Sequence, residues 1–361
     1  MQPRHSIGLE SDFQHEALAI ERNPEAGLTA IVAVHSTVLG PAIGGLRILP
    51  YPSWSAAMVD ALRLSEAMTL KTAAAGLPLG GGKAVLLQPP GGSDRRALMH
   101  AMGEMVNRLD GKFVIGEDIG TTPLDMDWIA ERTESVTGRS PAEGGLGDPS
   151  PATARTVFGA MRQALGLVAD SQDLTDRVVG IMGVGKVGGA LAQLAAEAGA
   201  RVILSDTDTE RALEVGAFCG AEVVPVAGFL ARPFDVFAPC AGGQVLNVES
   251  AGAVQCRVIA GAANNQLTED AAAEILHSRD IMYVPDFVAN CGGVIFNGAE
   301  YLKRDPGLID HDLDAAVRRT GELLQAAVSA NASPLTVARR AALDRISAAR
   351  AGRERQSAAQ P

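Results

Sequence analysis

The sequence predicts an α/β protein of two domains with a cleft between them. An apolar run at 178–182 enters a glycine-rich turn, continues through an Ala/Leu-rich helical stretch, and is followed by a second apolar run at 202–204. Strand-like and helix-like segments alternate on both sides of this unit, as they do in sheets covered by helices. The length of 361 residues also exceeds one usual hydrophobic core, which favours two domains.

The first half is expected to form an α/β domain of its own. Apolar runs predict strands at 28–38 and 113–115, and composition with apolar spacing predicts helices at 55–73 and 94–109. The segment 138–151 is rich in Gly and Pro and is interpreted as the crossing between the domains. A helix is predicted to begin just after it, at Thr153.

The second half is expected to form a Rossmann domain with a multi-stranded parallel sheet. Further strands are predicted near 222–226, 235–238, 257–260 and 281–284, and helices at 308–330 and 334–351. The final residues, RERQSAAQP, are expected to form a disordered tail. The predicted domains are 1–140 for substrate binding and assembly, 141–330 for the Rossmann domain, and 331–361 for a C-terminal helix and tail.

The glycine-rich turn predicts a dinucleotide site. Gly183 permits a tight turn, Gly185 lets the backbone approach a pyrophosphate, and Gly188 lets the helix pack against the strand. Asp206 lies at the end of the next strand, where a carboxylate accepts from a ribose hydroxyl. Asp206 would repel a 2′-phosphate and Thr207 is neutral, so NAD is favoured over NADP. The alternative is a glycine-rich turn without a ligand.

Composition and charge limit the classes of partner. The chain is 47% hydrophobic with only 4% aromatic residues and 40 glycines, so Ala, Val, Leu and Ile are expected to build the core. A net charge of −11 argues against nucleic acid and anionic membrane surfaces as partners. No apolar run reaches a membrane-spanning length, and the charged first thirty residues do not resemble a signal peptide. The widely spaced cysteines predict reduced thiols in a cytoplasmic protein: Cys219, Cys240, Cys256 and Cys291.

Two lysines in uncharged surroundings are candidate catalytic or binding groups. Lys71 ends MTLK, Lys83 follows three glycines, and the segment between them carries no charge. Burial lowers the pKa of a lysine and can make it a base near neutral pH. The alternative is that both ammonium groups reach solvent. A magnesium-holding phosphate loop is excluded, because Ala84 stands where that motif needs Ser or Thr.

Other polar residues follow predicted strands. Asp118, next to Glu117, comes directly after the strand at 113–115, where a carboxylate would face a cleft, although loop or capping roles are common for such residues. Arg47 follows a Gly-Gly step, and Asn264 follows the strand near 257–260. The six histidines do not cluster with these motifs in sequence, so neither a zinc site nor a histidine-based dehydrogenase is expected, and no metal is predicted.

Nine ordered motifs carry a specific resemblance. They are LGPAIGGLRILPY, MTLK, LPLGGGKAV, GEDIGTTPLDMD, GDPSPATA, GVGKVGG, APCA, GAANNQL and PDFVANCGGVI, over roughly residues 28–300. With these motifs the chain resembles the Glu/Leu/Phe/Val dehydrogenase family, in its leucine, valine and phenylalanine dehydrogenase branch. The resemblance implies NAD-dependent, reversible oxidative deamination of an apolar L-amino acid to its 2-oxo acid and ammonia. It also implies a homo-oligomer.

The resemblance implies roles for individual residues. Lys83 would be the catalytic lysine, Asp118 would exchange protons with the substrate amine, and Lys71 would bind the substrate carboxylate. Arg47 and Asn264 would be further substrate contacts. The cofactor would lie against Gly183, Val184, Gly185, Lys186, Val187, Gly188, Asp206, Thr207, Arg211, Cys240, Ala241, Ala263, Asn264, Thr153 and Ser150.

By family position, Ile43, Gly116 and Val294 would line the pocket for the substrate side chain. Val294 is similar to the branched-chain enzymes and Gly116 to the phenylalanine enzymes, so broad use of Val, Leu and Ile with some Phe is expected. The family's glutamate enzymes place a Lys where this chain has Ile43, which favours an apolar substrate. Two departures from the family pattern, Leu46 and Cys291, could reshape the pocket.

The resemblance also implies a two-stage reaction. The amine loses a proton towards Asp118 as the α-hydride leaves, and Lys83, neutral in part because of burial, then deprotonates the water that attacks the iminium carbon. Closure of the cleft would expel bulk water and position the groups. The alternatives are a phenylalanine-preferring enzyme of the same family, an oxidoreductase for another small acid, and a catalytically silent NAD-sensing protein. The presence of Lys71, Lys83 and Asp118 argues against the sensor.

Overall fold

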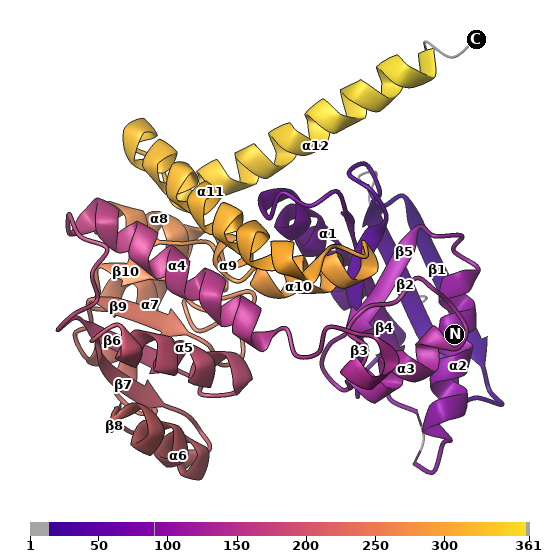
Figure 1. Ribbon diagram of the computed structural model, residues 1–361, viewed down its shortest axis with the longest axis horizontal. Coiled ribbons are helices and arrows are strands. Elements are labelled where there is room, and N and C mark those ends of the chain that lie inside the picture. Colours follow the sequence, from indigo (N-terminus) through magenta and orange to yellow (C-terminus); the bar gives the residue numbers. More distant parts are fainter. Residues whose placement is uncertain (1–13, 90, 359–361) are drawn as a thin grey trace, which may run out of the picture.

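Two β-sheets, each in its own lobe, organise the molecule. The computed structural model describes residues 14–89 and 91–358, and Figure 1 shows the N-terminal lobe on the right and the second lobe on the left. The N-terminal sheet has the order β1-β2-β4-β3-β5, with β1 and β2 antiparallel to their neighbours and β3 parallel to both β4 and β5. Its strands are β1 (Ala17–Asn23), β2 (Leu28–Ser36), β3 (Ala42–Leu49), β4 (Gly80–Leu87) and β5 (Phe113–Glu117).

Helices cover both faces of the N-terminal sheet. The long helix α1 (Trp54–Ala74) packs Ala57 and Ala61 against one face of β2 and β4. The helices α2 (Arg95–Asn107) and α3 (Pro123–Ala130) pack apolar side chains against the other face. Each helix begins at a residue whose side chain accepts a backbone N–H, and these caps are Ser53, Asp94 and Thr122.

The second sheet is entirely parallel and has the Rossmann strand order. Its order is β11-β10-β9-β6-β7-β8, so the chain moves outward from β6 in one direction and then in the other. The strands are β6 (Val178–Met182), β7 (Arg201–Ser205), β8 (Glu222–Val223), β9 (Val236–Pro239), β10 (Val258–Ile259) and β11 (Met282–Tyr283). The helices of this lobe are α4 (Ser150–Val168), α5 (Lys186–Glu197), α6 (Thr209–Cys219), α7 (Val248–Ala253) and α8 (Ala271–Ser278).

The last helices connect the two lobes. They are α9 (Asp286–Ala289), α10 (Gly292–Tyr301), α11 (Ile309–Ala330) and α12 (Pro334–Ala358), shown in orange and yellow in Figure 1, where α9 and α10 lie between the lobes and α11 and α12 above them. Val294 and Ile295 of α10 share a buried cluster with Ile43 of β3 and Val114 of β5. Arg345 of α12 donates to backbone carbonyls at the end of α1. The C-terminal helices therefore hold the N-terminal lobe and the Rossmann lobe together.

The predicted fold class is confirmed, and several element boundaries differ. The crossing segment ends earlier than expected, because α4 begins at Ser150 rather than Thr153. The prediction of a disordered tail was wrong for residues 353–358, since α12 runs to Ala358; the last three residues lie outside the described part of the chain. Strands β1, β3 and β4 were not predicted. The predicted domain boundaries at 140 and 330 stay predictions, because α10–α12 contact both lobes.

Candidate functional site

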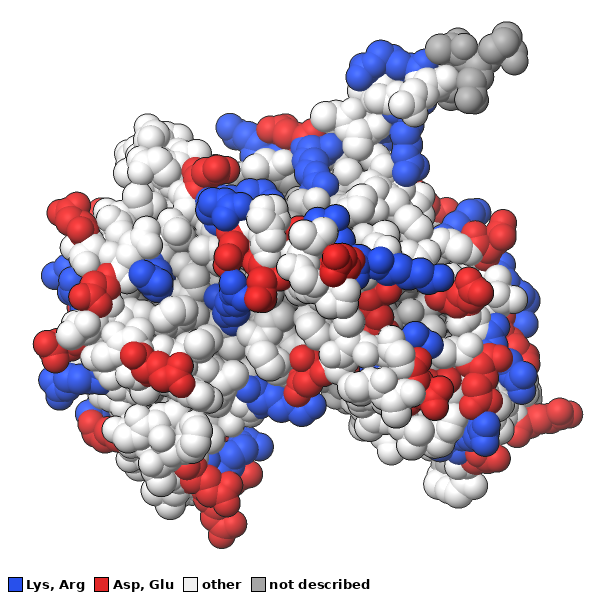
Figure 2. Space-filling model, in the orientation of Figure 1, with Lys and Arg blue, Asp and Glu red and all other residues white. Residues whose placement is uncertain are grey.

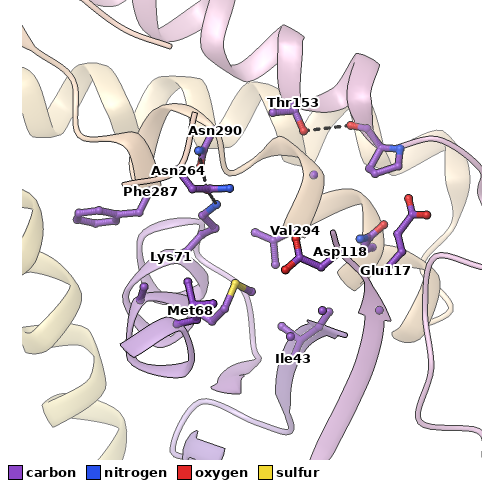
Figure 3. Close-up of a pocket in the computed structure, with 18 of the residues that line it drawn as sticks. Ile43, Met68, Lys71, Glu117, Asp118, Thr153, Asn264, Phe287, Asn290 and Val294 are labelled. Carbon is purple, nitrogen blue, oxygen red and sulfur yellow. Dashed lines mark hydrogen bonds between the residues drawn. The ribbon is translucent and has the colours of Figure 1, made fainter. Parts of the chain in front are cut away.

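A cavity of about 410 Å³ lies where the two lobes meet, at the carboxyl end of β5 and beside residues 43–47 of β3. It opens into the notch between the lobes that is visible in Figure 2. Figure 3 shows Lys71, Asp118, Ile43 and Val294 around the same space, with Asn264 and Asn290 approaching from the Rossmann lobe. Predicted site residues that line it are Ile43, Arg47, Lys71, Lys83, Gly116, Asp118, Ser150, Thr153, Val187, Asn264 and Val294.

Lys83 and Asp118 form a direct ion pair within this cavity. Lys83 Nζ donates to Asp118 Oδ2 at 2.5 Å, and the Lys83 side chain is only 7% exposed. Arg47 Nε donates to the same carboxylate oxygen at 3.0 Å. A Cβ on Gly44 would lie 1.9 Å from the Gly82 carbonyl oxygen, so the Gly-Gly step permits the close strand approach that brings these groups together.

Each member of the ion pair shifts the pKa of the other. Burial lowers the pKa of Lys83 below its ordinary value, against the raising influence of Asp118. Burial opposes ionisation of Asp118 as well, but the charges of Lys83 and Arg47 outweigh it and lower its pKa to about 2. Asp118 is thus a carboxylate at neutral pH, and burial makes Lys83 easier to deprotonate than an exposed lysine.

Arg47 is itself held by a second carboxylate behind the cavity. Arg47 donates through Nη1 to Asp60 at 3.1 Å, and Tyr51 donates its hydroxyl to the same oxygen at 2.7 Å. Arg63 completes the pairing of Asp60 at 2.8 Å. Since Arg47 bridges Asp118 and Asp60, its position is fixed by two ion pairs rather than by packing alone.

Lys71 reaches the cavity from α1 and meets the opposite lobe. Its Nζ donates to Asn264 Oδ1 at 2.8 Å, and Asn290 Nδ2 donates to the same oxygen at 2.9 Å. Burial lowers the pKa of Lys71, while the nearby Asp286 opposes that shift. A carboxylate that entered the cavity would offer Lys71 a charge-assisted partner stronger than the neutral amide.

The glycine turn between β6 and α5 has the shape that a pyrophosphate needs. Gly183 has φ +97°, and a Cβ there would lie 2.4 Å from the backbone N of Ala241. A Cβ on Gly188 would lie 1.9 Å from the Gly183 carbonyl oxygen, whereas one on Gly185 would meet nothing within 4 Å. The first N–H groups of α5 have no side-chain cap. This loop therefore fits a dinucleotide, with open space at Gly185 and free donors behind it.

Asp206 lies beside the same loop and is fixed by several donors. It accepts from Val184 N at 2.7 Å, from Asp208 N at 2.9 Å and from Arg211 at 2.9 Å. Burial opposes its ionisation, but these donors lower its pKa. The carboxylate is therefore charged and oriented, while Arg211 and the exposed Thr207 stand next to it at the surface.

The remaining predicted cofactor residues border the cavity or the loop. Lys186 is 74% exposed and pairs with Asp148 of the crossing segment at 3.3 Å. Thr153 donates its hydroxyl to the Pro149 carbonyl at 3.1 Å, at the start of α4. Most of the predicted cofactor residues do not line the cavity itself. These are Gly183, Val184, Gly185, Lys186, Gly188, Asp206, Thr207, Arg211, Cys240, Ala241 and Ala263.

The two departures from the family pattern lie behind the surface of the cavity. Leu46 is fully buried against α2 and α3, and Cys291 packs in the cluster that also holds Ile43 and Val294, so their effect on the pocket stays a prediction. Lys83 has a carboxylate partner that no local sequence signal indicated, because Asp118 lies 35 residues further along the chain. One histidine does contact a motif, because the Nδ1 of His35 lies 2.9 Å from the Thr69 hydroxyl of MTLK.

Several lining residues were not found from the sequence. They include Met68, Thr137, Asp286, Phe287, Asn290 and Asn297. Met68 belongs to MTLK, and Asp286, Phe287 and Asn290 belong to PDFVANCGGVI, so membership of a family motif was an available signal. Thr137 and Asn297 are 160 residues apart and carried no local signal. Among the described residues, no group of His, Cys, Asp and Glu is arranged to hold a metal ion.

Comparisons with known proteins find a matching family and similar enzymes. The Glu/Leu/Phe/Val dehydrogenase dimerisation domain matches residues 16–135, and the Glutamate/Leucine/Phenylalanine/Valine dehydrogenase domain matches residues 204–353. Two enzymes of Thermoactinomyces intermedius are similar: a leucine dehydrogenase, 40% identical over 82% of this chain and 84% of its own, and a phenylalanine dehydrogenase, 38% identical over 86% and 87%. The crystal structure of L-tryptophan dehydrogenase from Nostoc punctiforme has a TM-score of 0.81 at 34% identity, over 94% of this chain and 97% of that one.

Proposed function

The chain belongs to the Glu/Leu/Phe/Val dehydrogenase family, and we propose that it oxidatively deaminates an apolar L-amino acid with NAD. The products are the 2-oxo acid and ammonia, and the reaction is reversible. The observation that supports this proposal best is the Lys83–Asp118 ion pair, which shares one cavity with Lys71. A carboxylate binder, an amine-proton acceptor and a buried lysine base are the groups that the reaction requires.

The residues divide the reaction between them. Lys71 exchanges its contact with Asn264 for the substrate carboxylate and so fixes the amino acid in the cavity. Asp118 is ionised and accepts a proton from the substrate ammonium. Bound NAD supplies the hydride acceptor. Lys83, whose pKa burial lowers, deprotonates the water that attacks the oxidised substrate carbon, which general-base catalysis accelerates by about 10²–10⁴-fold.

The preference for NAD over NADP rests on Asp206. Its carboxylate is ionised and held by Val184 N, so it can accept from the ribose hydroxyls and repels a 2′-phosphate. Arg211 would favour a 2′-phosphate if it were free, but it is already paired with Asp206. The pair therefore supports NAD as the cofactor.

The substrate side chain is proposed to enter the pocket formed by Ile43, Gly116 and Val294. These residues carry no charge, and Ile43 and Val294 share a buried cluster with further apolar neighbours. Gly116 leaves space that favours a ring, which supports some use of Phe beside Val, Leu and Ile. A phenylalanine-preferring enzyme is the alternative within the family.

We also propose a cytoplasmic homo-oligomer. The matched N-terminal family domain is described as a dimerisation domain, and β1 leaves one edge of its sheet without a neighbouring strand in the described chain. All four cysteines are free thiols, as in reducing compartments. No helix in the described ranges is long and apolar enough to cross a membrane. Light scattering coupled to gel filtration measures the assembly, and a monomer would contradict it.

One assay tests the proposed function. Purified protein is incubated with NAD and a panel of L-amino acids, and reduced nicotinamide and ammonia are measured together. We expect the two products in equal amounts with branched aliphatic substrates. Hydride transfer without ammonia would indicate an oxidoreductase for another small acid. Binding of NAD without turnover of any amino acid would indicate a silent NAD-sensing protein.

A further inference from the structure

One wall of the cavity is built from residues that the reaction at Lys83 and Asp118 does not use. A Cβ added to Gly116 would lie 3.2 Å from the Thr137 methyl carbon. Thr137 in turn donates its hydroxyl to the backbone carbonyl of Asn297 at 2.7 Å. Gly116, Thr137 and Asn297 are therefore neighbours at the end of the cavity where Gly116 and Val294 meet the substrate side chain.

Asn297 adds a carboxamide to the wall that Gly116, Thr137 and Val294 form. It lies one helical turn after Val294 on α10, so both residues face the same side of the helix, and both line the cavity. The Oδ1 atom of Asn297 is buried and has no hydrogen-bond partner within the described chain. A buried polar atom without a partner is unfavourable, and an incoming group that pairs with the amide removes that penalty.

The chemistry of the wall selects a neutral group that both donates and accepts. The two ends of a carboxamide exchange when the side chain turns by 180°, so Asn297 can present either its oxygen or its nitrogen. The Thr137 hydroxyl is buried and donates to the Asn297 carbonyl, and its methyl carbon is the atom that faces Gly116, so Asn297 supplies the polar contact of this wall. A hydroxyl satisfies each of these possibilities.

An acidic group does not suit this wall. Glu117 also lines the cavity and would repel a carboxylate at the tip of a substrate side chain. The lysines that could balance such a charge are engaged elsewhere, Lys71 with Asn264 and Lys83 with Asp118. An acidic side chain would therefore be buried next to Asn297 without a cation.

We propose that Asn297 is a specificity-determining residue that favours L-amino acids with a hydroxyl on an otherwise apolar side chain over apolar side chains of the same shape. This inference rests on the proposed function and refines its substrate class. Apolar amino acids still enter the pocket, but they leave the carboxamide unpaired.

The test uses substrate pairs that differ in one hydroxyl. They are L-valine with L-threonine, L-norvaline with L-homoserine, and L-phenylalanine with L-tyrosine, which place the hydroxyl at three depths. The ratio of kcat/KM for the hydroxylated to the apolar member is measured in the wild-type protein and in Asn297→Leu, which keeps the shape of the side chain. Asn107→Leu, at an exposed asparagine of α2, is the matched control.

We expect Asn297→Leu to lower this ratio by about tenfold or more for at least one pair, while Asn107→Leu leaves all three unchanged. Ratios that stay the same in all three pairs would overturn the proposal, although turnover itself would still support the proposed function. Calorimetry with the same pairs gives ratios of Kd, so the inference is tested even if turnover is absent. Asn297→Val replaces Asn297→Leu if the latter does not fold.

Discussion

The two sides of the cleft differ in the chemical groups that they contribute. The N-terminal lobe contributes buried charges, with Lys83 and Arg47 both donating to Asp118 within 3.0 Å. The Rossmann lobe contributes backbone groups and missing side chains, because Gly183, Gly185 and Gly188 form the loop in front of α5. The proposed chemistry therefore depends on side-chain charge on one side, whereas the proposed cofactor binding depends on backbone shape on the other. Substitutions on the two sides should fail in different ways.

The largest expected effect is on the charged side. Lys83→Ala removes the general base and should lower kcat by about 10²–10⁴-fold. The Rossmann lobe is untouched, so the Kd for NAD, measured by fluorescence titration, should stay within about twofold of wild type. Lys112→Ala, at an exposed lysine before β5, is the control. Near-wild-type deamination by Lys83→Ala would contradict the comparison, because the reaction would then not depend on the charged groups of the N-terminal lobe.

In the Rossmann lobe, substitutions at two glycines distinguish an effect on cofactor binding from an effect on folding. Gly185→Ala has open space for its methyl group, so the melting temperature should not change, but the group would meet the pyrophosphate. We expect a loss of NAD affinity of about a hundredfold. Gly183→Ala should lower both affinity and melting temperature, because φ is +97° and the new Cβ meets Ala241. Unchanged NAD affinity in Gly185→Ala would contradict the assigned approach.

The charged side should also carry pH-dependent stability. The pKa of Asp118 is lowered from 3.8 to about 2, so its contribution is fully present above about pH 4 and is lost as the pH falls through about 2. The contribution is about 2 kcal/mol, or about thirtyfold in the unfolding equilibrium. The difference in free energy of unfolding between wild type and Asp118→Asn, from urea titrations, should narrow over this range. A difference independent of pH would contradict the ion pair.

In the Rossmann lobe, Asp206 supplies the charged group of the proposed cofactor site. Asp206→Ser removes the repulsion of a 2′-phosphate and frees Arg211 to bind it. We expect the ratio of kcat/KM for NAD to that for NADP to fall by about tenfold to a hundredfold. In Asp206→Ser/Arg211→Ala the NADP gain should disappear. If neither variant altered the ratio, the ribose contact would have to be reassigned.

The smallest effect is expected where the two lobes share the substrate pocket. Gly116→Ala adds a methyl group 3.2 Å from the Thr137 side chain, which must shift or narrow the pocket. The kcat/KM for L-phenylalanine should fall about tenfold relative to that for L-valine. This is the size of effect that one added or missing methylene has in an apolar pocket. Equal losses for both amino acids would show that Gly116 is not a specificity position.

The sequence by itself determined the features that depend on local backbone chemistry. The glycine turn needs a positive φ at Gly183 and close approach at Gly188, and few residues other than glycine tolerate either. The glycine motif therefore predicts the turn from the sequence alone. The parallel sheet of the Rossmann lobe appeared as continuous apolar runs, because strands buried on both faces have no polar alternation. The family motifs, in turn, located Lys71, Lys83 and Asp118.

Only the tertiary structure decided which distant groups meet. Lys83 lies on β4 and Asp118 directly follows β5, and they meet because β3 lies between these strands with two glycines at the contact. The unpaired amide of Asn297 likewise becomes meaningful only when α10 returns to the N-terminal lobe and places it against Thr137. Periodicity and propensity report what a residue does to its own segment. They carry no information about a partner that the fold brings from 160 residues away, so the charge network and the polar wall had to come from the structure.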